Sequence, residues 1–255
     1  MRLGIVGVGR MGGNMARAVL GAGRPLVVHD VDVAAVEELV ALGATAASTP
    51  VDLARQVDVA AVVVIDDLQV KQVVAGGTDA VWAIHSTVSP ATIHEVAQRA
   101  TVLDAPVAGG HDAAGRGEVA IMIGGDAAVL ERVRDAFSPY AGLIMHMGPL
   151  GAGQRTKLIK NLMTYTQLAL ADEVRSLIAE SGIDHAAFAK VLVHADRTTP
   201  AYGGLLQAEP WLAGVDARIP HKDLRACIAL ARELGVAAPI AELVDARIEH
   251  ALRGR

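Results

Sequence analysis

The stretch GIVGVGRMGG at residues 4–13 joins an apolar run to a cluster of glycines. Gly7, Gly9 and Gly12 have the spacing G-x-G-x-x-G, directly after a predicted strand at residues 2–8. In this motif the first glycine allows a tight turn, the second lets backbone approach a pyrophosphate, and the third lets helix and strand pack closely. The anion then lies at a helix N-terminus, where N–H groups and the helix dipole favour negative charge. The stretch predicts a dinucleotide-binding turn, and the alternative is a glycine turn that binds nothing.

A second predicted strand, PLVVHD at residues 25–30, ends in Asp30. An acid about 20 residues after the glycine turn accepts hydrogen bonds from the adenosine ribose hydroxyls. The same carboxylate would repel a 2′-phosphate, and the following residues HDVDVAA contain no arginine that could bind one. The sequence therefore favours NAD as the cofactor, with NADP less favoured.

Composition limits the class of protein. Of the 255 residues, 52% are hydrophobic and 20% charged, which is typical of a globular chain. The net charge of −5 and the 3% aromatic content argue against nucleic acid as a partner. Cys227 is the single cysteine, so a reducing, cytoplasmic setting is expected. Hydrophobic runs such as residues 59–65 are too short to span a membrane, and the N-terminus lacks the charged leader and cleavage site of a signal peptide.

The first 148 residues alternate β-branched runs with amphipathic helical stretches. This alternation predicts an α/β fold in which helices cover a parallel sheet. The predicted strands lie at residues 2–8, 25–30, 59–65, 80–85, 101–106, 119–125 and 142–148. Asp66 and Asp67 predict a helix N-terminus after the third of these strands, because acids favour that end of the dipole.

The second half of the chain reads as all-helical. Neither proline nor glycine interrupts the chain from Gln154 to Ser181, and helical spacing of apolar residues predicts one long helix there. Three further helices are predicted at residues 184–195, 221–235 and 237–252. Residues 196–220 are rich in helix breakers and are expected to form a loop with short helical pieces. We expect a dinucleotide-binding domain at residues 1–150 and an all-helical substrate and oligomerisation domain at residues 151–255.

Five segments together carry a family resemblance. They are GVGRMGGNMA, HSTVSP, DAPVAGGHDAAGRGEVAIMIGG, GPLGAGQRTKLIKN and HKDLRACIALARELGVAAP, in that order. In this order the chain resembles the β-hydroxyacid dehydrogenase family, which includes 3-hydroxyisobutyrate dehydrogenase and tartronate semialdehyde reductase and is related to 6-phosphogluconate dehydrogenase. The resemblance implies a Rossmann-like N-terminal domain, a long bridging helix, and long helices that pack against a partner subunit in a homodimer or larger homo-oligomer.

The resemblance also implies a reaction and its residues. The family oxidises a small 3-hydroxy acid, or reduces the matching aldehyde acid, with a nicotinamide cofactor; Lys157 matches its catalytic lysine and Asn161 the asparagine that accompanies it. Residues four apart on a helix share one face, so an ammonium and an amide there can converge on one oxygen. A lysine can supply the proton for carbonyl reduction once desolvation lowers its pKa from about 10.4. The alternative is that Lys157 is a solvated helix lysine.

Further matched positions imply contacts with the cofactor. Thr87 corresponds to a position near the nicotinamide end, at the mouth of a strand. Val64 and Ile65 occupy the place where family members line the cofactor with a Leu-Pro pair. Lys222 resembles a lysine of the C-terminal domain that contacts the cofactor, although an exposed lysine at a helix start would look the same. The cofactor contacts implied within the glycine turn include Arg10 and Met11.

The sequence departs from the family where the substrate is held. The family usually holds the substrate carboxylate with a serine and two glycines, whereas this chain has Ala108, Gly109 and Gly110. Loss of one hydrogen bond to a charged group costs about 1.5–3 kcal/mol. Either the backbone N–H groups suffice, or the substrate lacks a small carboxylate in this place. His111 could replace the lost donor, or it could be a solvated loop histidine.

Two other readings compete with a hydroxyacid dehydrogenase. The Ala108 change permits reduction of an imine or of a carbonyl compound without a carboxylate on the same scaffold. A non-catalytic dinucleotide-binding module is the second alternative, but it would need neither Lys157 nor Asn161. No metal is expected, because His, Asp and Glu show no metal-ligand spacing, and no hydrolase triad can be assigned.

Overall fold

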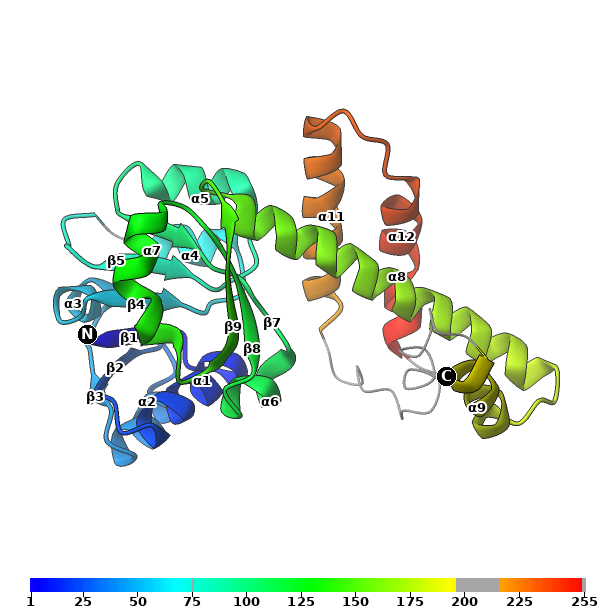
Figure 1. Ribbon diagram of the computed structural model, residues 1–255, viewed down its shortest axis with the longest axis horizontal. Helices are drawn as coiled ribbons and strands as arrows, with labels where there is room; N and C mark the ends of the chain where they lie inside the picture. The colour runs from blue at the N-terminus through cyan, green and yellow to red at the C-terminus, as the bar shows by residue number, and fades with distance from the viewer. Residues whose placement is uncertain (75, 196–215, 254–255) are drawn as a thin grey trace. The chain divides into compact units, whose positions relative to one another are not determined.

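The computed structural model describes residues 1–74, 76–195 and 216–253. The chain divides into two compact units, unit 1 at Met1–Lys157 and unit 2 at Leu158–Arg255. Unit 1 combines a sheet with helices, and unit 2 is helical in its described part (Figure 1). The predicted loop at residues 196–220 lies outside the described residues up to residue 215.

The described residues of unit 1 form a nine-stranded sheet in the order β3-β2-β1-β4-β5-β6-β8-β7, with β9 paired to β8. The strands are β1 (Leu3–Val6), β2 (Leu26–His29), β3 (Thr45–Ala46), β4 (Val59–Val62), β5 (Val81–Ile84), β6 (Val102–Asp104), β7 (Val107–Ala108), β8 (Val119–Gly124) and β9 (Ala141–Gly148). All seven predicted strands are confirmed. The pairs from β3 to β6 and the pair β8–β9 are parallel, whereas β8 runs antiparallel to β6 and β7.

Both faces of the central sheet are buried. Along β1, Leu3 and Ile5 pack into one apolar cluster with residues of the helices on one face of the sheet, while Val6 packs into a second cluster with residues of the helices on the other face. Because side chains alternate along a strand, burial of both faces requires a continuous apolar run, which is how β1, β4 and β5 read in the sequence. The alternating pattern of unit 1 thus positions helices on both sides of the sheet.

Five α-helices of unit 1 begin at a short polar residue that caps the helix. Thr49 and Ser89 each accept a hydrogen bond from a backbone N–H of the helix that follows, and each precedes a proline at the first helical position. Asp66 accepts from the backbone N–H of Gln69, so the predicted helix start at Asp66 and Asp67 is confirmed. The helices are α1 (Arg10–Gly21), α2 (Val33–Ala41), α3 (Pro50–Arg55), α4 (Asp67–Val73), α5 (Pro90–Ala97), α6 (Gly110–Gly115), α7 (Ala127–Val133) and the 3₁₀ turn η1 (Arg134–Phe137).

Unit 2 is built on the predicted long helix, which is confirmed as α8 (Ala152–Glu180) and is continuous in Figure 1. The other described helices are α9 (His185–Ala195), α11 (Arg218–Glu233) and α12 (Pro239–Arg253). The first half of α8 packs on α11 and α12 through Leu158 and Leu162, and its second half packs on α9 through Ala171 and Ile178. The described part of unit 2 therefore has small separate apolar clusters where unit 1 has two extensive ones.

Candidate active site

The carboxyl ends of the parallel strands bring several predicted residues to one edge of the sheet. Gly7 directly follows β1, Val64 lies two residues after β4, and Thr87 lies three residues after β5. In open α/β sheets ligands bind outside these ends, next to the point where the strand order reverses. That point lies between β1 and β4, where the glycine turn begins.

The three glycines of the turn have separate roles. A Cβ at Gly7, whose φ is +90°, would clash with the Val63 carbonyl oxygen, and a Cβ at Gly12 would clash with the Gly7 carbonyl oxygen. Gly9 is the N-cap of α1, and a Cβ there would meet no heavy atom of the described residues within 4 Å. Gly7 and Gly12 are thus required by the turn and its packing, whereas Gly9 leaves open space for a ligand at the helix N-terminus.

A cavity of about 570 Å³ lies beside this turn. Five residues expected at the cofactor line it: Gly7, Gly9, Asp30, Val64 and Ile65. Other lining residues were not expected from the sequence, among them Asp32, Pro50, Gln69, Gln72 and Val73. Gln69, Gln72 and Val73 are spaced by three and four residues on α4, so the helix start at Asp66 was the available signal for them. The cavity therefore extends from the glycine turn to a wall formed by α4.

Asp30 supports the glycine turn directly. Its Oδ2 accepts a hydrogen bond from the backbone N–H of Val8 at 2.6 Å, and its Oδ1 accepts one from the backbone N–H of Asp32 at 2.9 Å. A carboxylate oxygen can accept more than one hydrogen bond, so these contacts leave capacity for ribose hydroxyls. Asp30 and Asp32 together make this part of the cavity negative.

The first predicted substrate residue, Ala108, ends β7, and the other three follow it directly. Gly109 and Gly110 have φ values of +128° and +83°, a backbone conformation that side chains rarely adopt, and α6 starts at Gly110. His111 Nε2 contacts the Arg10 guanidinium, which can only donate, so Nε2 is the acceptor and the ring proton lies on Nδ1. That nitrogen lies 3.0 Å from Asp112 Oδ1. Both ring nitrogens of His111 are therefore engaged, and the structure brings the predicted cofactor residue Arg10 to the predicted substrate loop.

Lys157 and Asn161 lie one turn apart on α8, as predicted. Asn161 is buried, and its Nδ2 donates to Asp223 Oδ2 at 2.8 Å. The Tyr165 hydroxyl donates to the same oxygen at 3.0 Å. Burial, together with the charge of Asp223, raises the pKa of Tyr165. Burial also lowers the pKa of Lys160, and the nearby Asp223 charge opposes this shift.

Asp223 is a residue of the candidate site that the sequence did not predict. It is only 3% exposed, and its Oδ1 lies 3.5 Å from Lys222 Nζ. On α11 it falls on the buried face between Pro220 and Cys227. An acid at three and four residues from buried apolar positions was the signal that could have identified it.

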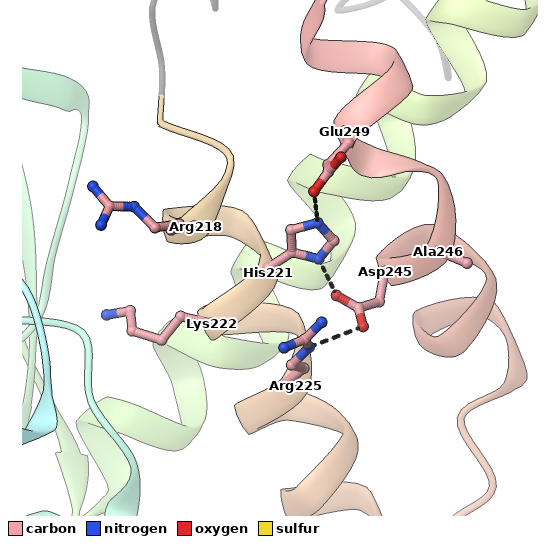
Figure 2. A pocket seen from close by; sticks show the side chains of 7 residues that line it. All are labelled: Arg218, His221, Lys222, Arg225, Asp245, Ala246 and Glu249. Carbon is pink, nitrogen blue, oxygen red and sulfur yellow. Dashed lines mark hydrogen bonds and ion pairs between the residues drawn. The ribbon is translucent and has the colours of Figure 1, made fainter.

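Lys222 lies in unit 2, where it lines a pocket of about 750 Å³ between α11 and α12 (Figure 2). His221 bridges these helices, since its Nδ1 hydrogen-bonds Asp245 and its Nε2 lies 3.4 Å from Glu249 Oε1. Arg225 Nε contacts the other Asp245 oxygen at 3.3 Å. The pocket is thus lined by the basic side chains of Arg218, Lys222 and Arg225, and His221 and Arg225 contact the acids of α12.

Two absences apply to the described part of the chain. No helix there is long and apolar enough to cross a membrane. The described residues also hold no group of three or more His, Cys, Asp or Glu side chains that could bind a metal ion.

Comparisons with known proteins cover nearly the whole chain. Residues 2–148 match the family described as the NAD binding domain of 6-phosphogluconate dehydrogenase, and residues 151–255 match the family described as NAD-binding of NADP-dependent 3-hydroxyisobutyrate dehydrogenase. An uncharacterised oxidoreductase of Mycobacterium tuberculosis is 34% identical, covering 97% of this chain and 92% of its own. An NAD-dependent L-serine dehydrogenase of Pseudomonas aeruginosa is 31% identical, covering 94% of this chain and 85% of its own.

Solved structures agree with these matches. A 3-hydroxyisobutyrate dehydrogenase from Salmonella typhimurium has a TM-score of 0.81 at 27% identity, covering 98% of this chain and 93% of that one. A reductive aminase from Aspergillus terreus shares the fold, with a TM-score of 0.70 at 19% identity over 99% of this chain and 93% of that one. The predicted fold class, nicotinamide cofactor and enzyme class are confirmed. The chain belongs to the β-hydroxyacid dehydrogenase family of nicotinamide-dependent oxidoreductases.

Proposed function

We propose that this protein transfers a hydride between NAD(H) and a small 3-hydroxy acid or its aldehyde or keto counterpart. The observation that carries the proposal is the attachment of α8 to the loop around Thr87. Gln154, in the first turn of α8, donates through Nε2 to the Ser86 carbonyl at 2.8 Å and accepts through Oε1 from the Val88 N–H at 3.1 Å. The helix that carries Lys157 therefore starts at the same sheet edge as the glycine turn.

Each residue has a distinct part in the proposed reaction. The bound nicotinamide supplies or accepts the hydride at the carbonyl carbon. Lys157 donates a proton to the carbonyl oxygen, where negative charge develops during reduction, and accepts the alcohol proton in the reverse direction. Asn161 orients that oxygen from the same helix face. Gly109 and Gly110 offer backbone N–H groups to the substrate carboxylate.

The cofactor preference rests on Asp30 and Asp32, which line the cavity beside the turn. A 2′-phosphate there would meet two carboxylates, so we propose NAD over NADP. Arg10, Met11, Gly12, Thr87 and Lys222 are proposed to contact the cofactor outside this cavity. The single, buried Cys227 fits a cytoplasmic setting.

We also propose a homodimer or larger homo-oligomer, with residues 1–150 binding the cofactor and residues 151–255 forming the substrate and oligomerisation domain. Ile159, Met163, Leu170 and Leu177 repeat on one face of α8 and are between 44% and 68% exposed. Exposed apolar side chains that repeat along one helix face are typical of a protein interface. Light scattering at micromolar concentration tests the assembly, and a monomer would contradict it.

A second candidate is reduction of an imine or of a carbonyl compound without a carboxylate. It is favoured by Ala108, which lacks the family hydroxyl, and by the engagement of His111 with Arg10 and Asp112, which leaves the ring without a spare donor. The backbone fold of a reductive aminase is compatible with this chemistry on the same scaffold.

One assay separates the candidates. Absorbance of the reduced nicotinamide is followed with L-serine, 3-hydroxyisobutyrate, short aldehydes and preformed imines, each with NAD(H) and NADP(H). Turnover of a hydroxy acid supports the leading proposal, and turnover restricted to imines supports the second. Cofactor binding without turnover of any compound would favour a non-catalytic binding module.

A further inference from the structure

Asp104 is a buried carboxylate at the end of β6 that accepts hydrogen bonds from the backbone at the start of α8. It has 0% exposure. Its Oδ1 accepts from the Gly151 N–H at 2.7 Å and its Oδ2 accepts from the Gln154 N–H at 2.7 Å, with a further backbone hydrogen bond from Gly153. Burial raises the pKa of Asp104, against the hydrogen bonds, which lower it. Burying the Asp104 carboxylate is costly, and its oxygens face the backbone N–H groups at the N-terminus of α8, which stabilise negative charge.

The surrounding backbone is shaped to admit this carboxylate. A Cβ on Gly124 would clash with Asp104 Oδ1 and lie 2.8 Å from the backbone nitrogens of Ala152 and Gly153. A Cβ on Gly153 would lie 2.8 Å from the Asp104 carbonyl oxygen and 2.9 Å from Oδ2. The first turn of α8 therefore lies close to β6 and β8, and the Asp104 carboxylate fills the space beside Gly124 and Gly153.

Gln154 attaches the start of α8 to a second part of unit 1, the loop around Thr87. Its backbone N–H is held by Asp104, while its side chain, which has 0% exposure, pairs with the backbone on both sides of Thr87. Lys157 lies three residues further along the helix, on the neighbouring turn of the same side. Ser86 extends this series of hydrogen bonds, because its Oγ accepts from the Val64 N–H at 2.8 Å. Every hydrogen bond of this series joins two residues of unit 1.

We propose that Asp104 and Gln154 are positioning residues, which set the place of Lys157 relative to the Thr87 loop at the nicotinamide end of the cofactor site. The inference rests on the proposed role of Lys157 as the proton donor. Because proton and hydride transfer need near-attack geometry, a displacement of about 1 Å can lower turnover about 100-fold without affecting cofactor affinity. Stabilisation of the fold alone would not produce that separation.

The test is a double-mutant cycle on folded, full-length protein, using the panel compound that the parent turns over fastest. Asp104→Asn keeps the size of the side chain but points an amide nitrogen at a backbone N–H. We expect kcat to fall about 100-fold, with the dissociation constant of NADH within about twofold. In the Lys157→Ala background the same change should alter residual turnover by less than about twofold, because residues that act through one group are non-additive.

Asp126→Asn is the matched control. Asp126 also accepts from two backbone N–H groups at a helix N-terminus, those of Ala128 and Val129, but on the exposed start of α7. It should leave kcat unchanged. Gln154→Met, which removes the hydrogen bonds around Thr87, is the second variant. It should lower kcat as Asp104→Asn does, and it should likewise have little effect in the Lys157→Ala background.

The outcomes are distinct. An equal loss from Asp104→Asn with and without Lys157, or an unchanged kcat, overturns the positioning role. Failure of both Asp104→Asn and Gln154→Met to fold also overturns it and assigns the pair to stability. If Lys157→Ala alone retains the turnover of the parent, it is the proposed function of Lys157 that fails.

Discussion

Asn161 turns its amide nitrogen toward Asp223, with 2.8 Å between Nδ2 and Oδ2. A carboxylate oxygen can only accept, so this contact fixes which end of the Asn161 amide faces Asp223. Asp223 thereby determines how the predicted partner of Lys157 is presented.

Asp223→Asn should lower kcat about tenfold, because loss of a hydrogen bond to a charged group costs about 1.5 kcal/mol or more. Steady-state kinetics on the best panel substrate measure this effect. Tyr165→Phe removes the other donor to the same oxygen and should cost less, since Asn161 stays held. A folded Asp223→Asn variant with parental kcat would show that Asn161 needs no such support.

Lys157→Ala should reduce turnover by about 10²–10⁴-fold while NADH binding stays nearly intact, the range typical of a lost general acid or base. Lys157→Arg should fail almost as badly, because a guanidinium with a pKa above about 12 gives up its proton poorly. Asn161→Ala should cost less, since the proton donor remains. Parental turnover in both Lys157→Ala and Asn161→Ala would reject the assignment and direct attention to other groups.

The protein should bind NAD(H) more tightly than NADP(H), because Asp30 and Asp32 would repel a 2′-phosphate. Fluorescence titration with both reduced cofactors gives the ratio. Asp30→Asn keeps an acceptor for the Val8 N–H and removes one negative charge. The ratio of the NADP(H) to the NAD(H) dissociation constant should therefore fall about tenfold. The corresponding free energy lies between the values for one charge pair in water and in a protein interior. A preference of the parent for NADP(H) would contradict the argument from Asp30.

Ala108→Ser should improve the use of small 3-hydroxy acids about tenfold in kcat/KM, near the lower end of a charged hydrogen bond. The added hydroxyl would stand beside the backbone N–H groups of Gly109 and Gly110. The comparison is made with 3-hydroxyisobutyrate and with an imine that has no carboxylate, whose turnover should not rise. Equal kcat/KM for the acid in parent and variant would indicate that something other than a carboxylate docks here.

His85 should make unit 1 sensitive to acid. Its Nδ1 donates to the Ala105 carbonyl at 2.6 Å and its Nε2 accepts from Tyr140 at 2.9 Å, and burial lowers its pKa to about 4. Below pH 6.5 the unfolded chain binds a proton that the folded chain does not, so the free energy of unfolding falls as the pH falls toward 4. Between pH 7.5 and pH 5 this loss is about 2 kcal/mol.

Urea unfolding of the parent and of His85→Gln at these two pH values isolates the effect of His85, since other titrating groups contribute equally to both. The variant should lose about 2 kcal/mol less than the parent on acidification. Equal losses would show that His85 is protonated, or accessible, in the folded protein.

Patterns formed by residues close together in the sequence were enough to predict most strands and the long helix. The seven longer strands and α8 were foreseen because burial on two faces, or on one helix face, leaves a periodic pattern within a few residues. The two-residue strands β3 and β7 are too short to show a period, and the periodic pattern of β8 does not say in which direction it pairs with β6 and β7. Five residues that line the cavity beside the glycine turn were anticipated, among them Asp30, but none of those on α4.

The sequence by itself determined the α/β fold, the glycine turn and the spacing of Lys157 and Asn161, because backbone conformation at glycines and side-chain spacing on a helix are local properties. Tertiary structure alone decided that Asp104 receives the start of α8, that Gln154 pairs around Thr87, and that Asp223 holds Asn161. These partners lie 47 to 68 residues apart in the chain. A buried polar side chain must find a partner, but which distant group supplies it is set by packing, and no short-range pattern records that choice.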